Sequence, residues 1–362
     1  MTYSGLRLSE AGRTMQTCGW AALSAQMLGV VLRHLRRPPV CSYLEGPVRR
    51  LAFGLYVAVA TVACPAAALA QGPRNVTRSP ASENAVAWSP DSRQILVSSN
   101  RSGVYDIYLL SLDGPRFEQP VFHSLADDFV GAWSSQRGIA FVSLRDGNPE
   151  IYVAAGVGAP ARNVSMHPGA DWLPSWGVDG TLVYNTSRFG GLPEIVIGAE
   201  ASSLVRITED EFYDAGAELS PDGRQVLYHS RRDGNYDLYL KNLADGTVDR
   251  LTSHPADDSY GSWSPDGRRI AFRSARDGNS EIYTIEIATR EVARFLHWPA
   301  SSENHPAWSP DGACIAFISD RDGNDEVYVA AAPGRLDCAA AAVNHLNVSI
   351  NEIRERIVLE VR

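Results

Sequence analysis

The sequence predicts an all-β fold, a six-bladed β-propeller of four-stranded antiparallel blades that is closed by the N-terminal strand. Three observations support it. A short run ends on an anchor residue every 43–45 residues. Each repeat contains two Gly-rich turns, and Asp-Gly favours a tight turn because glycine adopts positive φ without steric cost. The runs between the turns are short, β-branched and aromatic, which favours strands over helices. The anchors are Trp88, Trp133, Trp176, Leu219, Trp263 and Trp308.

The composition limits the partners that the protein can have. The 362-residue chain has a net charge of −9, and 44% of its residues are hydrophobic. This hydrophobic content is typical of a globular protein. Binding to nucleic acid depends mainly on basic groups that neutralise phosphates, so we expect no nucleic-acid partner. An acidic protein instead favours cations or a partner with a basic face.

Residues 48–70 are predicted to be a signal peptide. Arg49 and Arg50 precede a short apolar run that ends in small residues, and we expect cleavage after Ala70. The mature protein would then be periplasmic or secreted, without a transmembrane anchor. An uncleaved anchor, a twin-arginine signal and lipoprotein processing at Cys64 are the alternatives.

The predicted propeller occupies residues 71–334. The repeat provides six first, second and third runs, but the sixth copy ends near residue 330 without a fourth run. A matching run occurs at 74–77, directly after the predicted cleavage site. We therefore expect the N-terminal strand to complete the sixth blade, which removes exposed sheet edges.

Two segments lie outside the propeller. Residues 1–47 precede the signal peptide and are interpreted as an extended or non-native N-terminus, with the true start codon left open. Residues 335–362 are expected to form a C-terminal tail packed on the propeller. Cys314 and Cys338 follow the cleavage site, and in an oxidising compartment they are candidates for a disulfide between the tail and the last repeat. Two buried thiols are the alternative.

The sixth copy carries the clearest family pattern, PAWSPDGACIAFISDRDGNDEVYV over residues 306–329. This pattern resembles the TolB-like, WD40-like β-propeller repeat, and the resemblance covers roughly residues 74–332. TolB carries an α/β domain before its propeller, so the resemblance implies a TolB-type propeller without that domain. It also implies an envelope protein or lipoprotein as partner. The same repeat occurs in tricorn- and prolyl-oligopeptidase-like proteases and in oligogalacturonate lyase, so the fold alone does not determine the function.

Two charged positions recur in all six copies. An acid stands five residues before each anchor, at Glu83, Asp128, Asp171, Asp214, Asp258 and Glu303. An arginine stands in each second turn, at Arg101, Arg145, Arg188, Arg232, Arg276 and Arg321. Strand parity places both sets on one face of the ring, at the mouth of the central tunnel. Each arginine could tie its turn to a carboxylate; alternatively, unpaired acids could bind Ca²⁺, Mg²⁺ or a basic peptide.

A binding site should break the symmetry of the repeat. Trp172, Tyr260 and His305 lie beside the acids and differ from blade to blade, so we predict that they join the acids in binding a ligand at the tunnel mouth. Aromatic side chains beside acids suit a peptide or a sugar. Ordinary loop packing is the alternative.

These observations favour a binding or scaffolding function over an enzyme. No catalytic residue is predicted, because the sequence contains neither a G-x-S-x-G nor an H-E-x-x-H motif. We expect an exported, monomeric cell-envelope propeller that engages a protein, a peptide or a cation through the tunnel mouth, with no cofactor other than possible Ca²⁺ or Mg²⁺. The alternative is a polysaccharide lyase or hydrolase that uses the same face. The identity of the partner stays open.

Overall fold

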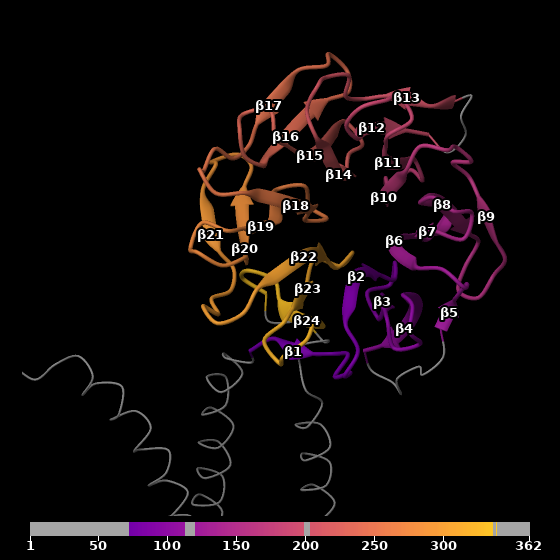
Figure 1. Cartoon of the computed structure of the whole chain (residues 1–362). Coiled ribbons are helices and arrows are strands. Elements are labelled where there is room, and N and C mark those ends of the chain that lie inside the picture. Colours follow the sequence, from indigo (N-terminus) through magenta and orange to yellow (C-terminus); the bar gives the residue numbers. More distant parts are fainter. Residues whose placement is uncertain (1–71, 113–119, 199–202, 336–337, 339–362) are drawn as a thin grey trace, which may run out of the picture. The chain divides into compact units, whose positions relative to one another are not determined.

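The computed structural model describes residues 72–112, 120–198, 203–335 and 338, which form six four-stranded antiparallel sheets set as blades around a ring (Figure 1). The predicted six-bladed propeller is therefore confirmed. The predicted signal peptide, the segment before it and most of the C-terminal tail lie outside the described residues. The described part of the chain contains no helix of the length and hydropathy needed to cross a membrane.

The first strand of every blade is the innermost one and lines the central tunnel (Figure 1). It runs from the acid that begins it to the anchor at its end. Each of these strands contains a register shift against the second strand, and such β-bulges re-aim side chains. The first strands are β2 (Glu83–Trp88), β6 (Asp128–Ser134), β10 (Asp171–Trp176), β14 (Asp214–Leu219), β18 (Asp258–Trp263) and β22 (Glu303–Trp308).

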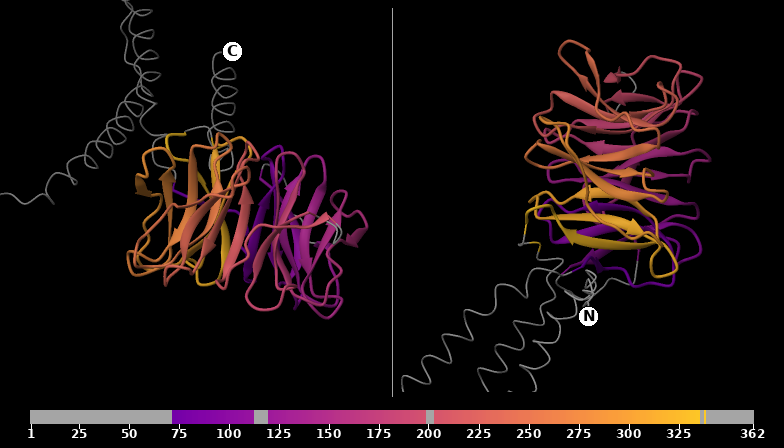
Figure 2. Two further views of the ribbon diagram at one scale, coloured as in Figure 1. Left: turned by 90° about the horizontal axis from the view of Figure 1, so that it is seen from above. Right: turned by 90° about the vertical axis from the view of Figure 1, so that its left-hand side faces the viewer.

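The second and third strands form the centre of each blade. Figure 2 shows the strands of all blades running between the same two faces of the ring. The second strands are β3 (Gln94–Ser99), β7 (Gly138–Ser143), β11 (Leu182–Thr186), β15 (Gln225–Ser230), β19 (Arg269–Ser274) and β23 (Cys314–Ser319). The third strands are β4 (Asp106–Ser111), β8 (Glu150–Ala154), β12 (Glu194–Ile197), β16 (Asp237–Asn242), β20 (Glu281–Glu286) and β24 (Glu326–Ala331).

The outermost strands are short. They are β5 (Pro120–Phe122), β9 (Ala161–Asn163), β13 (Val205–Arg206), β17 (Val248–Arg250), β21 (Val292–Arg294) and β1 (Arg74–Asn75). β1 pairs with β24, with Arg74 opposite Val329, so the N-terminal strand completes the sixth blade as predicted. Thr77 extends this closure, because its Oγ1 donates a hydrogen bond to Glu326 Oε2 at 2.5 Å.

The apolar core lies in the seams between blades. In β23, Ile315 and Phe317 belong to the core shared with blade five, whereas Ala316 belongs to the core shared with blade one. All three are 0% exposed. Alternate residues of a strand point to opposite faces, so a run that is apolar throughout fills two seams at once. Burying a side chain such as Ile or Phe contributes roughly 1.5–3 kcal/mol, which makes each seam a major source of stability.

The SPDG turns close the face opposite the acids, which we call the SPDG face. In blade six, Ser309 Oγ donates to Asp311 Oδ1 at 2.6 Å and accepts from the backbone N–H of Cys314 at 2.9 Å. Gly312 adopts a φ of 70°, a conformation that L-residues other than glycine rarely take. Blade one has Ser92 at the corresponding position, and it adopts the same kind of conformation at a φ of 60°.

The predicted disulfide is present between Cys314 at the start of β23 and Cys338. Both residues are buried, at 3% exposure, in the core between blades six and one. The disulfide therefore fixes the beginning of the C-terminal tail to the blade that also holds β1.

Candidate functional site

Each blade buries the carboxylate that begins its first strand and pairs it with the arginine of its own second turn. In blade five, Arg276 Nη2 lies 3.0 Å from Asp258 Oδ2, and the two side chains are 15% and 0% exposed. The same pair recurs in the other blades at 3.0–3.6 Å. The acids and arginines therefore share one face of the ring, as strand parity predicted, and we call it the mouth face. The pairs are Glu83–Arg101, Asp128–Arg145, Asp171–Arg188, Asp214–Arg232, Asp258–Arg276 and Glu303–Arg321.

In five blades the arginine also joins the second and third strands, whereas Arg188 of blade three contacts Tyr184 of the second strand. Arg276 Nε donates to Ser274 Oγ at 2.8 Å, and its guanidinium carbon lies 4.6 Å from the centre of the Tyr283 ring. In two of these carboxylates, burial outweighs the nearby arginine charge. It raises the pKa of Glu83 to about 7 and that of Asp214 to about 6. These pairs tie the turns to the inner strands around the ring.

The carboxylates of these pairs do not line the tunnel. The tunnel cavity has a volume of about 580 Å³, and none of the six acids is among its lining residues. Within the described ranges, no group of three or more His, Cys, Asp or Glu side chains is placed to hold a metal ion. Binding of Ca²⁺, Mg²⁺ or a basic peptide by the acid ring is not tested by these contacts and stays a prediction.

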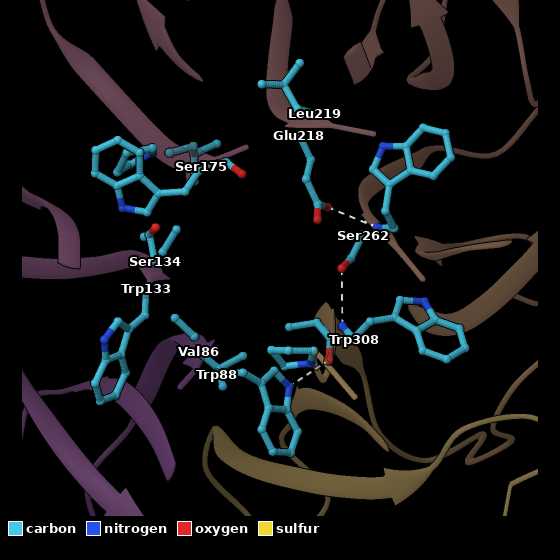
Figure 3. A pocket seen from close by; sticks show the side chains of 18 of the residues that line it. Val86, Trp88, Trp133, Ser134, Ser175, Glu218, Leu219, Ser262 and Trp308 are labelled. Carbon is cyan, nitrogen blue, oxygen red and sulfur yellow. Dashed lines mark hydrogen bonds between the residues drawn. The ribbon is translucent and has the colours of Figure 1, made fainter. Parts of the chain in front are cut away.

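Glu218 is the acid that does line the cavity, and the sequence reasoning missed it (Figure 3). The corresponding residue, one before the anchor, is Ala or Ser in the other five blades. Glu218 Oε2 accepts a hydrogen bond from the backbone N–H of Trp263 in the next blade at 3.1 Å. Burial raises the pKa of Glu218 to about 8, although this N–H and the Ser262 hydroxyl act against the shift. A comparison of the position before each anchor would have revealed this residue.

Aromatic side chains near the acid ends of the first strands form two groups of contacting rings. Over blades one to three, Phe129 lies 5.2 Å from Tyr105 and 6.0 Å from Trp172, measured between ring centres. Over blades four to six, contacts join five rings, those of Tyr213, Tyr236, His229, Tyr260 and His305. The predicted site residues Trp172, Tyr260 and His305 thus lie in these two groups.

Tyr260 and His305 both reach the tunnel cavity. Their ring centres are 4.2 Å apart, and both residues have positive φ, 52° and 50°, at the bulges of β18 and β22. The equivalent residues of blades three and four, Leu173 and Gly216, also have positive φ, so this conformation belongs to the bulge of the repeat. The fold therefore holds these two rings at the tunnel wall through a backbone feature that sequence patterns did not reveal.

Two histidines share this part of the mouth. His229, in β15, is buried at 4% exposure, and its Nδ1 accepts a hydrogen bond from the backbone N–H of Tyr260 at 3.4 Å. Burial, together with the positive charge of Arg273, lowers the pKa of His229 to about 3 and that of His305 to about 4. Both imidazoles are therefore neutral at physiological pH. The sequence reasoning missed His229 and Arg273, which occupy the same position in the second strands of blades four and five.

The chain is similar to known proteins over nearly all of the predicted propeller. Residues 64–233, 216–299 and 259–349 match the family described as the TolB beta propeller domain. An uncharacterized protein of Agrobacterium fabrum is 26% identical over 187 residues, which cover 49% of this chain and 61% of that protein. The Tol-Pal system protein TolB of Anaeromyxobacter dehalogenans is 32% identical over 94 residues, covering 25% of this chain and 20% of that protein.

A solved structure shares the fold. The crystal structure of TolB from Acinetobacter baumannii matches with a TM-score of 0.50 at 20% identity, covering 80% of this chain and 71% of that one. The chain spans less than two thirds of the length of each of the two sequence relatives. The family match nevertheless extends over more than half of the chain. The chain therefore belongs to the TolB β-propeller domain family.

Proposed function

We propose that this protein is a binding and scaffolding propeller of the cell envelope that engages a segment of an envelope protein or lipoprotein through its mouth face. The observation that carries the proposal is the pair of aromatic groups around the tunnel mouth. Rigid aromatic side chains dominate the centres of protein interfaces because they bury a large area at a small cost in conformational entropy. The relative named as a Tol-Pal system protein and the predicted signal peptide support the envelope location.

The rest of the molecule suits a scaffold. The acid–arginine pairs and the apolar seams fix the blades, so the mouth presents its rings on a rigid frame. A preorganised surface loses little entropy on binding, which favours affinity. The departures from sixfold symmetry lie in the aromatic groups and in single positions such as Glu218, as expected where binding rather than folding selects the residues.

Site-specific photo-cross-linking in the producing cell tests this proposal. A photoreactive phenylalanine analogue at Phe129 should capture an envelope protein, because Phe129 is part of the mouth group. The matched controls are the same analogue at Leu243, 37% exposed in the turn after β16 on the SPDG face, and at Val248, 43% exposed on outer strand β17. Equal capture from all three positions, or capture of cytoplasmic proteins alone, would count against the mouth as the binding face.

The enzyme alternative has its own readout. Purified protein incubated with oligogalacturonate and divalent cations should give no new unsaturated or reducing ends. Turnover that is lost when Tyr260 and His305 are replaced would support a carbohydrate-active function at the same face.

A further inference from the structure

Arg273 is a half-buried arginine that forms no ion pair with any described residue. Its Nε donates to Ser280 Oγ at 2.8 Å and its Nη1 donates to Ser259 Oγ at 3.3 Å. Nη2 has no acceptor among the described residues, and the side chain is not fully covered. In contrast, the arginines of all six second turns meet a buried carboxylate. Two serine contacts thus orient the guanidinium of Arg273 and leave its charge unmatched.

The position of Arg273 in the blade places it at the mouth. It pairs in register with Ser259, next to the acid that begins β18, and it reaches Ser280 in the second turn. The corresponding residues of the other second strands have no chemistry in common, and none of them is an arginine. They are Ser98, Val142, Asn185, His229 and Ile318. This position therefore carries no structural role common to the six blades, unlike the paired arginines.

Arg273 and its neighbours offer hydrogen-bond donors and aromatic rings that together suit a carboxylate. Its charge acts on both His229 and His305, and the ring of Tyr260 contacts each of the two imidazoles, at 5.2 and 4.2 Å. A guanidinium offers its donors in a planar fork that matches the two oxygens of a carboxylate. The imidazoles can add N–H donors, and the aromatic rings provide apolar contact beside them.

We propose that the mouth of blades four to six binds a carboxylate of a peptide segment, an acidic side chain or a chain terminus, with Arg273 as the group that recognises it. This inference rests on the proposed function, because it names the chemistry that the mouth would recognise in a protein partner. It assigns a positive charge to the binding surface, although the chain as a whole is acidic.

Binding of a carboxylate has an electrostatic consequence at the two histidines. The titratable and charged groups placed around them are Arg273 from β19, Tyr260 from β18 and Tyr236 from the turn before β16. A carboxylate at Arg273 offsets the charge that lowers the pKa of His305, so this pKa should rise in the complex. Binding should accordingly become tighter as the pH falls from the raised pKa of His305 in the complex toward about 4.

Peptide titrations of the full mature chain test the proposal. The probe is an acetylated, amidated peptide that contains Glu-Tyr-Glu. A Gln-Tyr-Gln peptide is the uncharged control, and the same control with a free C-terminus distinguishes a chain terminus from a side chain. NMR of the histidine ring protons reports binding and the pKa of His305, and calorimetry gives the affinity. We expect the carboxylate probes to bind more tightly than the uncharged control and to raise the pKa of His305.

Variants of β19 and its turn supply matched controls. Arg273→Gln should weaken binding of the Glu peptide by about tenfold to a hundredfold, the range of a hydrogen bond to a charged group. Arg273→Lys should restore part of that loss. Arg268→Gln, at an exposed arginine on the SPDG turn of the same blade, should change nothing. Circular dichroism melting should give nearly the same Tm for all these variants.

Several outcomes would overturn the proposal. These are equal binding of the Glu and Gln peptides, unchanged affinity in Arg273→Gln, binding of oligogalacturonate in place of peptide, and failure of every carboxylate probe to bind at millimolar concentration. The cross-linking experiment separates this failure from failure of the proposed function. A mouth-specific cross-link that persists in Arg273→Gln would leave the scaffold in place and remove the carboxylate site.

Discussion

Glu218 Oε2 accepts a hydrogen bond from the backbone N–H of Trp263 at 3.1 Å, across the seam between blades four and five. Ser262 Oγ makes the same contact with the backbone N–H of Trp308 in the next seam, at 3.2 Å. A neutral hydroxyl and a carboxylate therefore do the same structural work at successive positions around the tunnel. The carboxylate differs from the hydroxyl in that it can ionise, and burial in this cavity makes its charged form unfavourable.

The raised pKa of Glu218 predicts a specific pH dependence of stability. At pH values between the ordinary carboxyl pKa of 4.5 and about 8, the unfolded chain releases this proton while the folded chain keeps it. Ionisation then favours unfolding, so stability falls as the pH rises through this window. Glu218→Gln removes the titration and keeps an acceptor oxygen.

As the pH rises from 5 to 8, we therefore expect the Tm of Glu218→Gln to increase relative to that of the wild type. Calorimetric melting at several pH values measures the difference. The comparison with the wild type isolates Glu218. Glu83 and Asp214 also have raised pKa values, but they are present in both proteins, so their effect on the Tm cancels. Parallel pH profiles for the two proteins would show that Glu218 titrates as it does in the unfolded chain.

Breaking one acid–arginine pair should be strongly destabilising. Arg276→Ala leaves the carboxylate of Asp258, 0% exposed, without its ion pair. Removing one partner of a buried pair costs about 3 kcal/mol, at the lower end of the usual range because Arg276 is partly exposed. For a domain of this size that lowers the Tm by about 10 °C.

The exposed Arg268 of the same blade is the control for this substitution, and Arg268→Ala should leave the Tm nearly unchanged. Urea unfolding of Arg276→Ala, of Asp258→Asn and of the double variant measures the coupling between the two side chains. Additive losses in the double variant would mean that the pair is not what holds the turn.

Cation binding by the acid ring can be tested separately. Replacing Asp128, Asp171 and Asp258 with Asn should lower the Tm, because each acid is buried against an arginine. We expect millimolar Ca²⁺ or Mg²⁺ to leave the Tm of both proteins unchanged, since the arginines already supply the counter-charge. A cation-induced rise in Tm of the wild type that is absent from the triple variant would show that the ring binds the ion.

The disulfide should stabilise the last blade. Cys314 and Cys338 are 24 residues apart, and a cross-link that closes a loop of this length contributes about 3 kcal/mol in the chain-entropy model. Cys338→Ser should therefore lower the Tm, and reduction of the wild type should lower it to a similar extent. A reductant that shifts the Tm of Cys338→Ser as much as that of the wild type would contradict this assignment.

Deleting the closing strand should open the ring. A chain that lacks residues 72–77 loses the pairing of Arg74 and Asn75 with β24 and leaves the buried Glu326 without the hydroxyl of Thr77. We expect a large loss of stability together with self-association, because an unpaired strand edge is a template for another chain. Size-exclusion chromatography with light scattering measures the association. A monomer with wild-type Tm would show that β1 is dispensable.

Much of the fold could be predicted because the same succession of strands and turns recurs in the sequence of every blade. Anchors such as Trp88, the SPDG turns and the apolar runs recur every 43–45 residues. Because the sixth copy lacks a fourth run, the matching run that begins at Arg74 was predicted to complete it. Strand parity predicted that acids such as Asp258 and arginines such as Arg276 share one face, and their pairing was one of two alternatives. These features depend on local chain geometry, which sequence periodicity records.

The mouth was predictable only in part. Tyr260 and His305 were identified because they lie beside the acids, but their contact crosses a seam between blades and needs the ring geometry. Arg273 and Glu218 were overlooked, although each differs visibly from its equivalents in the other blades. Sequence periodicity identifies the residues that the repeats share. Arg273 and Glu218 differ from the equivalent residues of the other blades, so periodicity does not identify them. Their burial, and hence the pKa of Glu218, depends on packing that one sequence does not display.

Closure by β1 also has a consequence for how the protein reaches its native state. Asn75 and Tyr328, which are neighbours in the sixth blade, are separated by 253 residues in the chain. The first of the described strands is thus among the last to find its partner, and contacts between residues so distant in sequence form slowly. The first five blades can each form from strands that are consecutive in the sequence. The rate at which the finished ring appears should therefore be set by the meeting of its two ends.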